Sequence, residues 1–281
     1  EKAHCVLVAE QAADDVERQP TPHRTRQRGP KSDGNWCIDQ MALHRHAYQP
    51  IGVIGQRVAM HQGARVQALG ALGGLSSTTT AQLDGTIDLA GGHHRLYAAG
   101  MRNPNGLAWQ PQSGELWTTV NERDGPGDQL VPDYVTEVRA NQFFGWPWYY
   151  IGQRRDTRPR AALPTDLPPV TVPSVLLQAH SASLGAAFYT GSQFPAEYKH
   201  SLFIAAHGSW NRANPTGSKV IRVAFDSAGN AKRYYEGFMT GFTVSNHNVW
   251  GRPVGIAIGK DGSLFVSEDA NKSIYCVSYT G

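Results

Sequence analysis

The first 94 residues of the chain contain almost no aromatic side chains. Of 7 Trp, 11 Tyr and 9 Phe residues, only Trp36 and Tyr48 precede residue 95, and the first Phe is Phe143. Because aromatic side chains supply a large share of the area buried in a core, this stretch is poorly equipped to build a packed domain alone. It also lacks the sustained two-residue or 3.6-residue hydrophobic repeat of strands and helices.

Three interpretations of this stretch stay open: a disordered or linker segment, a poorly patterned folded part, or a segment translated outside its natural frame. Regular patterning resumes at about Thr86, where TIDLAGGHHRLYAAGMRNPNGLAW alternates apolar strands with turn residues. We therefore divide the chain into an irregular segment over residues 1–85 and a β-rich domain over residues 86–281.

Cysteine, charge of one sign and long apolar runs are also scarce. The 3 cysteines, Cys5, Cys37 and Cys276, cannot all pair and have no metal-binding spacing, so no disulfide framework follows. The net charge of +3 comes from interspersed basic and acidic residues, which argues against a nucleic-acid partner. No run approaches the roughly 18 apolar residues of a membrane span, and no signal peptide is visible over residues 1–30.

Three segments of the second half share one pattern, in which a G-x-A strand is followed by a turn and a second apolar strand. They are RNPNGLAWQPQSGELWTTV from Arg102, HSASLGAAFYTGSQFPAEYKHSLFIAA from His180, and RPVGIAIGKDGSLFVSE from Arg252. Ser-Gly in the first and Asp-Gly in the third are strong turn signals. Recurrence of one strand unit predicts an all-β protein built by radial repetition, a β-propeller.

A basic side chain precedes the strand glycine in each repeat. Arg102, His180 and Arg252 occupy this position, so rotation of the blades would bring them toward one axis. Two guanidinium groups and an imidazole facing one cavity suit a ligand with several carboxylates, because Arg binds carboxylate in bidentate geometry. The alternative is that each side chain braces only its own blade.

The segment NERDGPGDQLVPDY, residues 121–134, follows the strand ELWTTV. Its Gly125-Pro126-Gly127 core leaves backbone carbonyls free to face a hard cation, with Asp124 and Asp128 beside them. This pattern predicts a calcium site. An ordinary surface turn has a similar composition and is the alternative.

Two further segments carry unusual side chains. FFGWPWYY, residues 143–150, is interpreted as packing at a blade junction in preference to a sugar-stacking platform. AAHGSWNRANPTGSK, residues 205–219, is a loop with Arg212 and Lys219 that either reaches over the axis or remains a solvated hairpin loop.

At these residues the chain resembles the glucose/sorbosone dehydrogenase family, the soluble pyrroloquinoline quinone (PQQ)-dependent sugar dehydrogenases, and most of all its L-sorbosone dehydrogenase-like branch. The resemblance covers about residues 95–281 and follows a series of motifs in order: GMRNPNGLAW, ELWTTVNERDGPGDQLVPDY, FFGWP, HSASLGAAFY, LFIAAHGSWNRANPTGSKVIRV and WGRPVGIAIGKDGSLFVSEDAN. It implies a propeller of the six-bladed sugar dehydrogenase type, here incomplete and preceded by an irregular or disordered N-terminal segment.

The resemblance also implies a site. Arg102, Asn103 and Arg252 match quinone-binding positions of the family, and Gly125 and Pro126 match the carbonyls that hold calcium. A family lysine that contacts the quinone has no clean counterpart, so Arg212 and Lys219 are the candidates to replace it. The implied cofactors are PQQ and calcium.

The implied partners are a small-molecule sugar substrate and an electron acceptor, either a cytochrome or a quinone. The sugar would lose its C1 hydrogen as hydride to the quinone. The family's usual location is the periplasm or the extracellular space.

The family's catalytic histidine has no recognisable counterpart. His44, His46 and His61 precede the R-N-P motif, but none stands in the expected strand and loop context, so no catalytic base is assigned. A non-catalytic propeller binding module and a truncated inactive homologue are the alternatives, followed by a calcium-dependent sugar-lactone hydrolase. The sequence gives no oligomeric state.

Overall fold

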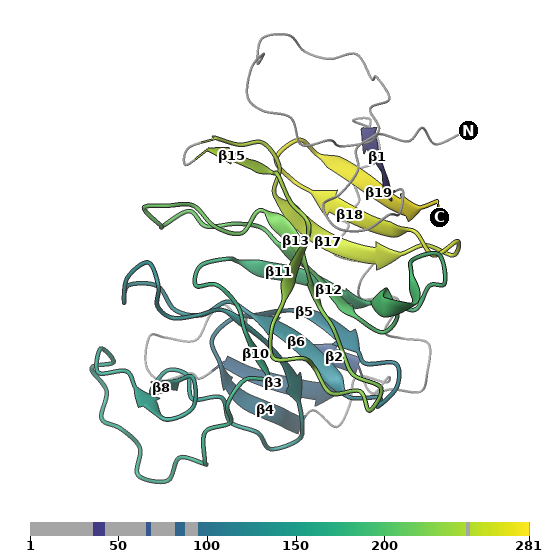
Figure 1. Cartoon of the computed structure of the whole chain (residues 1–281). Helices are drawn as coiled ribbons and strands as arrows, with labels where there is room; N and C mark the ends of the chain where they lie inside the picture. The colour runs from purple at the N-terminus through teal and green to yellow at the C-terminus, as the bar shows by residue number, and fades with distance from the viewer. Residues whose placement is uncertain (1–35, 43–65, 69–81, 88–94, 246–247, 281) are drawn as a thin grey trace.

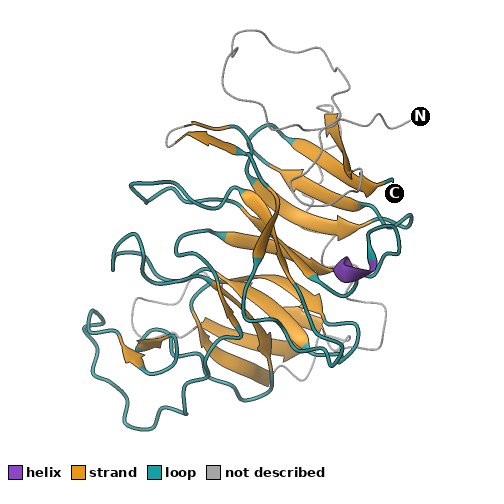
Figure 2. Cartoon of the chain, in the orientation of Figure 1, coloured by secondary structure: helices purple, strands orange, loops and turns teal. Residues whose placement is uncertain are grey.

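The described residues of the chain form β-strands, turns and one short 3₁₀ helix (Figure 2). The computed structural model describes residues 36–42, 66–68, 82–87, 95–245 and 248–280. The 3₁₀ helix, η1, spans Ala196–Tyr198, and the described residues contain no α-helix. The predicted all-β class is therefore confirmed.

Three four-stranded antiparallel sheets, each one blade, follow one another along the chain from bottom to top in Figure 1. The first blade has the strand order β10 (Val175–Leu176), β7 (Tyr134–Val138), β6 (Leu116–Val120), β5 (Pro104–Trp109). The second has the order β11 (Ser183–Phe188), β12 (Leu202–Ala206), β13 (Lys219–Val223), β14 (Glu236–Met239). The third has the order β1 (Trp36–Ala42), β19 (Ser273–Tyr279), β18 (Leu264–Glu268), β17 (Pro253–Ile258).

Three smaller sheets complete the described structure. They are β2 (Val66–Ala68) with β3 (Gln82–Ile87) and β4 (Arg95–Met101), β8 (Tyr149–Tyr150) with β9 (Arg154–Arg155), and β15 (Thr243–Ser245) with β16 (Asn248–Val249). Successive packed sheets of this kind give the predicted propeller-type fold, which is confirmed. The irregular N-terminal segment that we expected falls largely on residues outside the described ones.

The predicted repeats coincide with the blades. The strand pairs β5–β6, β11–β12 and β17–β18 are the two strands of the three repeated segments. Gly114 and Gly262 have positive φ angles of 72° and 87° in the β5–β6 and β17–β18 turns, where glycine adopts a conformation unfavourable for other residues. The Ser-Gly and Asp-Gly turn predictions are confirmed.

The G-x-A glycines let the first strands of neighbouring blades approach closely. A Cβ atom at Gly106 of β5 would lie 2.1 Å from the carbonyl oxygen of Leu184 in β11. A Cβ atom at Gly185 of β11 would lie 2.7 Å from the carbonyl oxygen of Val254 in β17. The register of all three strands shifts at the repeat glycine, so one backbone irregularity recurs in each blade.

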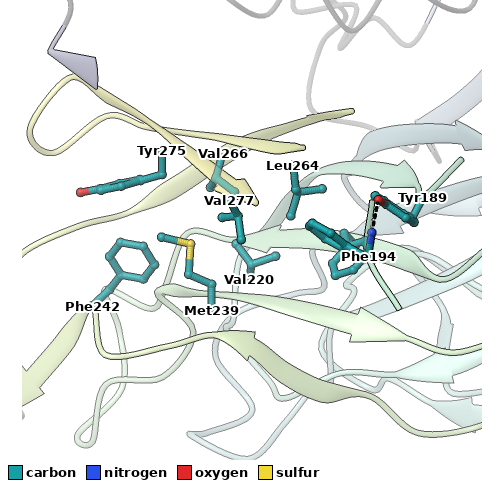
Figure 3. Close-up of a cluster of buried hydrophobic side chains, with 10 residues drawn as sticks. Tyr189, Phe194, Val220, Met239, Phe242, Leu264, Val266, Tyr275 and Val277 are labelled. Atoms are coloured by element: carbon teal, nitrogen blue, oxygen red, sulfur yellow. Dashed lines mark hydrogen bonds between the residues drawn. The ribbon is translucent and has the colours of Figure 1, made fainter. Parts of the chain in front are cut away.

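The core lies between blades. Middle strands β6 and β12 are buried at every position. The sequence of β12, LFIAA, is apolar throughout, whereas β6 buries Thr118 and Thr119. Leu202 and Ile204 of β12 face the first blade, whereas Phe203 faces the third. Figure 3 shows the cluster between the second and third blades, where the Tyr189 hydroxyl accepts a 2.9 Å hydrogen bond from the Phe194 backbone.

Of the first 42 residues of the chain, the structure describes only Trp36–Ala42, and these residues form β1, which completes the third blade. It pairs with β19 in continuous antiparallel register from Trp36 opposite Tyr279 to Ala42 opposite Ser273. The division of the chain at residue 86 stays a prediction.

Candidate functional site

The three basic residues of the repeats lie at equivalent places in their blades. Arg102, His180 and Arg252 each precede the first strand of a blade, which begins at Pro104, Ser183 or Pro253. Because these strands start corresponding blades, the three residues occupy the same end of the blade stack. Convergence of the three side chains on one shared ligand stays a prediction.

The loop after β6 approaches the same end. Gly125 and Gly127 have φ angles of 99° and 118°, so the Gly-Pro-Gly segment adopts a backbone that requires glycine on both sides of Pro126. Arg158 Nη1 donates a 2.7 Å hydrogen bond to the carbonyl of Asp124. The carbonyls of Gly125 and Pro126 accept no hydrogen bond from any described residue, so both remain available to a ligand.

Asp124 is the centre of a polar cluster that joins three segments of the chain. Its carboxylate lies 3.7 Å from Arg102 Nη2 and 3.3 Å from His180 Nδ1. The side-chain amide of Asn211 donates a 2.7 Å hydrogen bond to Asp124 Oδ1. The structure therefore brings Arg102, His180, the Gly-Pro loop and the loop after β12 together, as the sequence predicted for Arg102 and the loop carbonyls.

Both nitrogens of the His180 ring have partners. Nε2 lies 3.0 Å from the carbonyl of Gly127, and Nδ1 faces Asp124 and Asn211. The side chain is only 6% exposed. His180 therefore anchors the Gly-Pro loop to the start of β11.

Arg102 contacts the loop through its backbone carbonyls as well. Its Nη1 lies 3.1 Å from the carbonyl of Glu122 and 3.5 Å from that of Asn121. The Arg102 side chain remains 31% exposed, so part of the guanidinium is open to a ligand. The neighbouring Asn103 is half-buried, and its side-chain amide makes no hydrogen bond with a described residue.

Arg252 lies outside this hydrogen-bonded cluster. Its half-buried guanidinium makes no hydrogen bond or ion pair with any described residue, while its backbone contacts Glu268 and Asp269. Asp269 also binds His207 Nε2 at 3.0 Å, and the His207 backbone donates to the carbonyl of Ala182. The loop after β12 thus touches both the Asp124 cluster and the strand end that carries Arg252.

Arg212 and Lys219 are placed differently from each other. Arg212 Nη1 donates a 3.1 Å hydrogen bond to the carbonyl of Ala179, next to His180, so Arg212 borders the cluster. Lys219 Nζ lies over the ring of Tyr235, 5.8 Å from its centroid, and burial lowers the pKa of its ammonium group. No described contact brings Lys219 to Asp124 or Arg102.

A network of buried charged side chains supports the loop after β6. Arg123 forms 2.9 Å ion pairs with Glu122 and Asp156 and lies 4.7 Å from the ring centroid of Trp146. Hydrogen bonds from Arg158 and Arg123 hold the pKa of Asp156 well below its usual range. FFGWPWYY therefore packs around Arg123, in agreement with its interpretation as a packing element.

Asp133 is a buried carboxylate that the sequence did not single out. It is 2% exposed and accepts hydrogen bonds from the backbone of Glu122 at 2.8 Å and Ala182 at 2.9 Å. Burial raises the pKa of Asp133 to about 6, although these hydrogen bonds oppose the shift. Its only sequence signal was its place at the end of the NERDGPGDQLVPDY segment.

The described part of the chain contains no group of three or more His, Cys, Asp and Glu side chains arranged to hold a metal ion. No helix there has the length and hydropathy needed to cross a membrane.

The chain is similar to one family model and to several known proteins. The family model described as TrAA12-like matches residues 164–280. An uncharacterized protein of Borreliella burgdorferi is 35% identical over 196 residues, which cover 69% of this chain and 51% of that protein. A pyrroloquinoline quinone-dependent pyranose dehydrogenase of Coprinopsis cinerea is 28% identical over 122 residues, which cover 37% of this chain and 16% of that protein.

A solved structure of the Trichoderma reesei carbohydrate-active enzyme family AA12 protein has the same fold. It superposes with a TM-score of 0.54 at 16% identity, covering 87% of this chain and 65% of that chain. The chain spans about half the length of the Borreliella relative and a smaller part of the Coprinopsis one. The family model over residues 164–280 supports the resemblance of the chain to the glucose/sorbosone dehydrogenase family, and the Trichoderma reesei structure shows a shared fold.

Proposed function

We propose that the chain is a PQQ-dependent oxidoreductase that oxidises a sugar at C1, of the aldose or sorbosone dehydrogenase type. The observation that carries this proposal is the meeting of Arg102, His180 and the Gly-Pro loop around Asp124. The similarity to a PQQ-dependent pyranose dehydrogenase supplies the identity of the cofactor.

The side chains at this end of the blades fit a quinone that carries several carboxylates. The partly exposed Arg102 guanidinium and the Arg252 guanidinium, which has no described partner, are suited to bind carboxylate. Asn103 has a side-chain amide without a described partner beside Arg102. The buried Asn121 Oδ1 and Asn211 Oδ1 atoms also lack a hydrogen-bond partner, as expected where a ligand supplies one.

The Gly-Pro loop fits a calcium ion. Hard cations prefer oxygen ligands, and the carbonyls of Gly125 and Pro126 accept no other described hydrogen bond. Arg158 and His180 fix the loop on either side through the carbonyls of Asp124 and Gly127. We propose Gly125 and Pro126 as the calcium ligands, with Arg102, Asn103 and Arg252 as quinone-binding residues.

Each part of the protein has a defined task in this proposal. The bound quinone supplies the hydride acceptor for the C1 hydrogen of the sugar. Arg102 and Arg252 hold and orient the ligand, His180 keeps the calcium loop in place, and Arg212 braces the backbone beside it. No group is assigned as acceptor of the hydroxyl proton, and His44, His46 and His61 lie outside the described residues.

The loop after β12 would form the sugar-facing wall. Trp210 is 82% exposed and precedes Asn211, which is fixed to Asp124. Ser209 and Thr216 hydrogen-bond across the base of this loop, so the Trp210 ring projects from an anchored backbone. An aromatic face in this place could stack on a sugar ring. We further propose a cytochrome or quinone as electron acceptor and a periplasmic or extracellular location.

Reconstitution tests this proposal. The full chain is loaded with PQQ and calcium, and reduction of a dye is followed with aldoses and with sorbosone. We expect dye reduction that requires both the quinone and a sugar. Quinone binding without sugar-dependent reduction would favour a non-catalytic binding module or an inactive homologue, and absence of quinone binding would reject the proposal.

A further inference from the structure

Asp133 lies next to the proposed site, between the loop after β6 and the segment that leads into β11. Its side chain is buried and touches both of these segments. Oδ1 accepts a 2.8 Å hydrogen bond from the backbone of Glu122. Oδ2 accepts hydrogen bonds from the backbone of Ala182 at 2.9 Å and from Ser181 Oγ at 3.2 Å.

Each of these contacts lies next to a residue of the site. The carbonyl of Glu122 accepts a hydrogen bond from Arg102, so the peptide groups on both sides of Glu122 are fixed by Asp133 and Arg102. Ser181 and Ala182 directly follow His180, which holds the Gly-Pro loop. One buried carboxylate is therefore coupled to both ends of the Asp124 cluster.

The backbone that leads into β11 has an unfavourable conformation, which the hydrogen bonds to Asp133 stabilise. His180 and Ala182 have φ angles of 63° and 52°, a left-handed conformation that is unfavourable for residues other than glycine. The hydrogen bond from the Ala182 backbone to Asp133 holds the chain in this conformation. The His180 ring consequently points at Asp124 and Gly127.

The chemistry of the contacts requires a carboxylate. All three partners of Asp133 are neutral donors, and a carboxylate offers two oxygen atoms that only accept. An asparagine of the same shape would accept with one oxygen and turn its NH₂ group toward a donor. The three hydrogen bonds offset part of the cost of burying this carboxylate, and they tie it to both segments of the site.

We infer that Asp133 is a positioning residue that sets Arg102 and His180 relative to each other without touching the quinone. This inference rests on the proposed function for the identity of the ligand. Its structural part, that Asp133 joins the loop after β6 to the start of β11, is independent of the ligand.

The test compares Asp133→Asn with Thr136→Val in the full chain. Thr136 is a buried polar residue of the adjacent strand β7 that hydrogen-bonds to Ser174, so its loss reports a general effect on packing. PQQ affinity is measured in the presence of calcium by quenching of intrinsic fluorescence. Backbone hydrogen exchange is measured over residues 121–128 and 178–182.

We expect Asp133→Asn to weaken quinone binding by about tenfold or more, the usual effect of losing a supporting hydrogen-bond partner. The Glu122 or Ala182 amide should exchange faster, while Thr136→Val retains wild-type affinity. Asp133→Asn affinity within about twofold of wild type, or an equal loss in Thr136→Val, would overturn the inference.

Two further outcomes are also decisive. If the wild-type chain binds no quinone, the proposed function fails, and the exchange data alone decide the role of Asp133. If Asp133→Asn does not fold, Ser181→Ala replaces it, because this change removes one hydrogen bond to Asp133 and keeps both backbone contacts. Ser181→Ala should then weaken binding by about threefold, and unchanged affinity would contradict the inference.

Discussion

The side-chain amide of Asn211 donates a 2.7 Å hydrogen bond to Asp124 Oδ1, which joins the loop after β12 to the loop after β6. A second contact reinforces this connection, since the Ala213 backbone donates to Asp128 Oδ2 at 3.0 Å. The two loops belong to different blades. Their connection fixes the Gly-Pro carbonyls relative to Trp210, and so relates the proposed calcium site to the proposed sugar-facing wall.

Arg102→Ala should abolish high-affinity quinone binding and leave the fold intact. The Arg102 side chain is 31% exposed, and its ion pair with Asp124 spans 3.7 Å, so its loss removes little packing. A charged hydrogen bond to a ligand contributes roughly 1.5–3 kcal/mol, which corresponds to at least a tenfold loss of affinity. Fluorescence titration with PQQ and thermal unfolding measure the two effects.

Arg139→Ala is the matched control, because Arg139 is 57% exposed and makes surface ion pairs with Glu115 and Glu137. It should bind quinone as the wild type does. Wild-type affinity in Arg102→Ala would remove Arg102 from the site.

Gly125→Ala should weaken calcium binding. The φ angle of 99° is strained for alanine, and the added Cβ would lie 2.8 Å from Arg158 Nη1. Relief of this strain, on the order of 1–3 kcal/mol, would move the Gly125 carbonyl. Gly114→Ala has a comparable φ of 72° with no atom within 4 Å of the new Cβ, so it should lower stability without affecting calcium affinity. Calorimetric calcium titration of both variants provides the comparison, and equal affinities would contradict the assignment.

Gly106→Ala should prevent the blades from packing correctly. Its Cβ would lie 2.1 Å from the Leu184 carbonyl oxygen, which belongs to the backbone of the next blade and cannot rotate away. Overpacking typically costs about 1–3 kcal/mol, and a backbone clash this close should reach the upper end or exceed it. Urea unfolding measures the change, with Gly114→Ala as the control for a glycine substitution outside the contact. A wild-type midpoint for Gly106→Ala would contradict the observed approach of β5 and β11.

Asp133 should make stability depend on pH between about 4 and 6. Its pKa is raised from 3.8 to about 6, so the folded state binds the proton more tightly than the unfolded state. The free energy of unfolding should therefore decrease by about 3 kcal/mol from this group as pH rises through the window. The difference between wild-type and Asp133→Asn unfolding curves isolates this contribution, because the other titrating groups are shared. A difference that is constant between pH 4 and 7 would contradict it.

Limited proteolysis tests the division of the chain at residue 86. We predict cleavage within residues 1–85 and a resistant product that begins near Thr86. Because β1 pairs with β19, the contrary result would be that Trp36–Ala42 resists cleavage and stays with the resistant product. That result would contradict the division at residue 86. Mass spectrometry of the retained peptides distinguishes the two outcomes.

The candidate site was only partly accessible from the sequence. Arg102, Gly125 and Pro126 could be named because they repeat a position or form a local motif. Asn211 and Asp133 could not, since Asn211 lies 87 positions from Asp124, and Ala182 lies 49 positions from Asp133. The proposed convergence of Arg252 with the cluster is supported by its strand position, but no described hydrogen bond joins them.

The sequence by itself determined the all-β class, the repeated strand pairs and their turns, because hydrophobic alternation and glycine-containing turns act over a few neighbouring residues. Only the tertiary structure decided that Asp124 binds Asn211, that Arg123 pairs with Asp156 and that Asp133 joins two segments. These contacts depend on how blades stack. Packing of one sheet against the next selects which distant polar groups meet, and no local pattern encodes that choice.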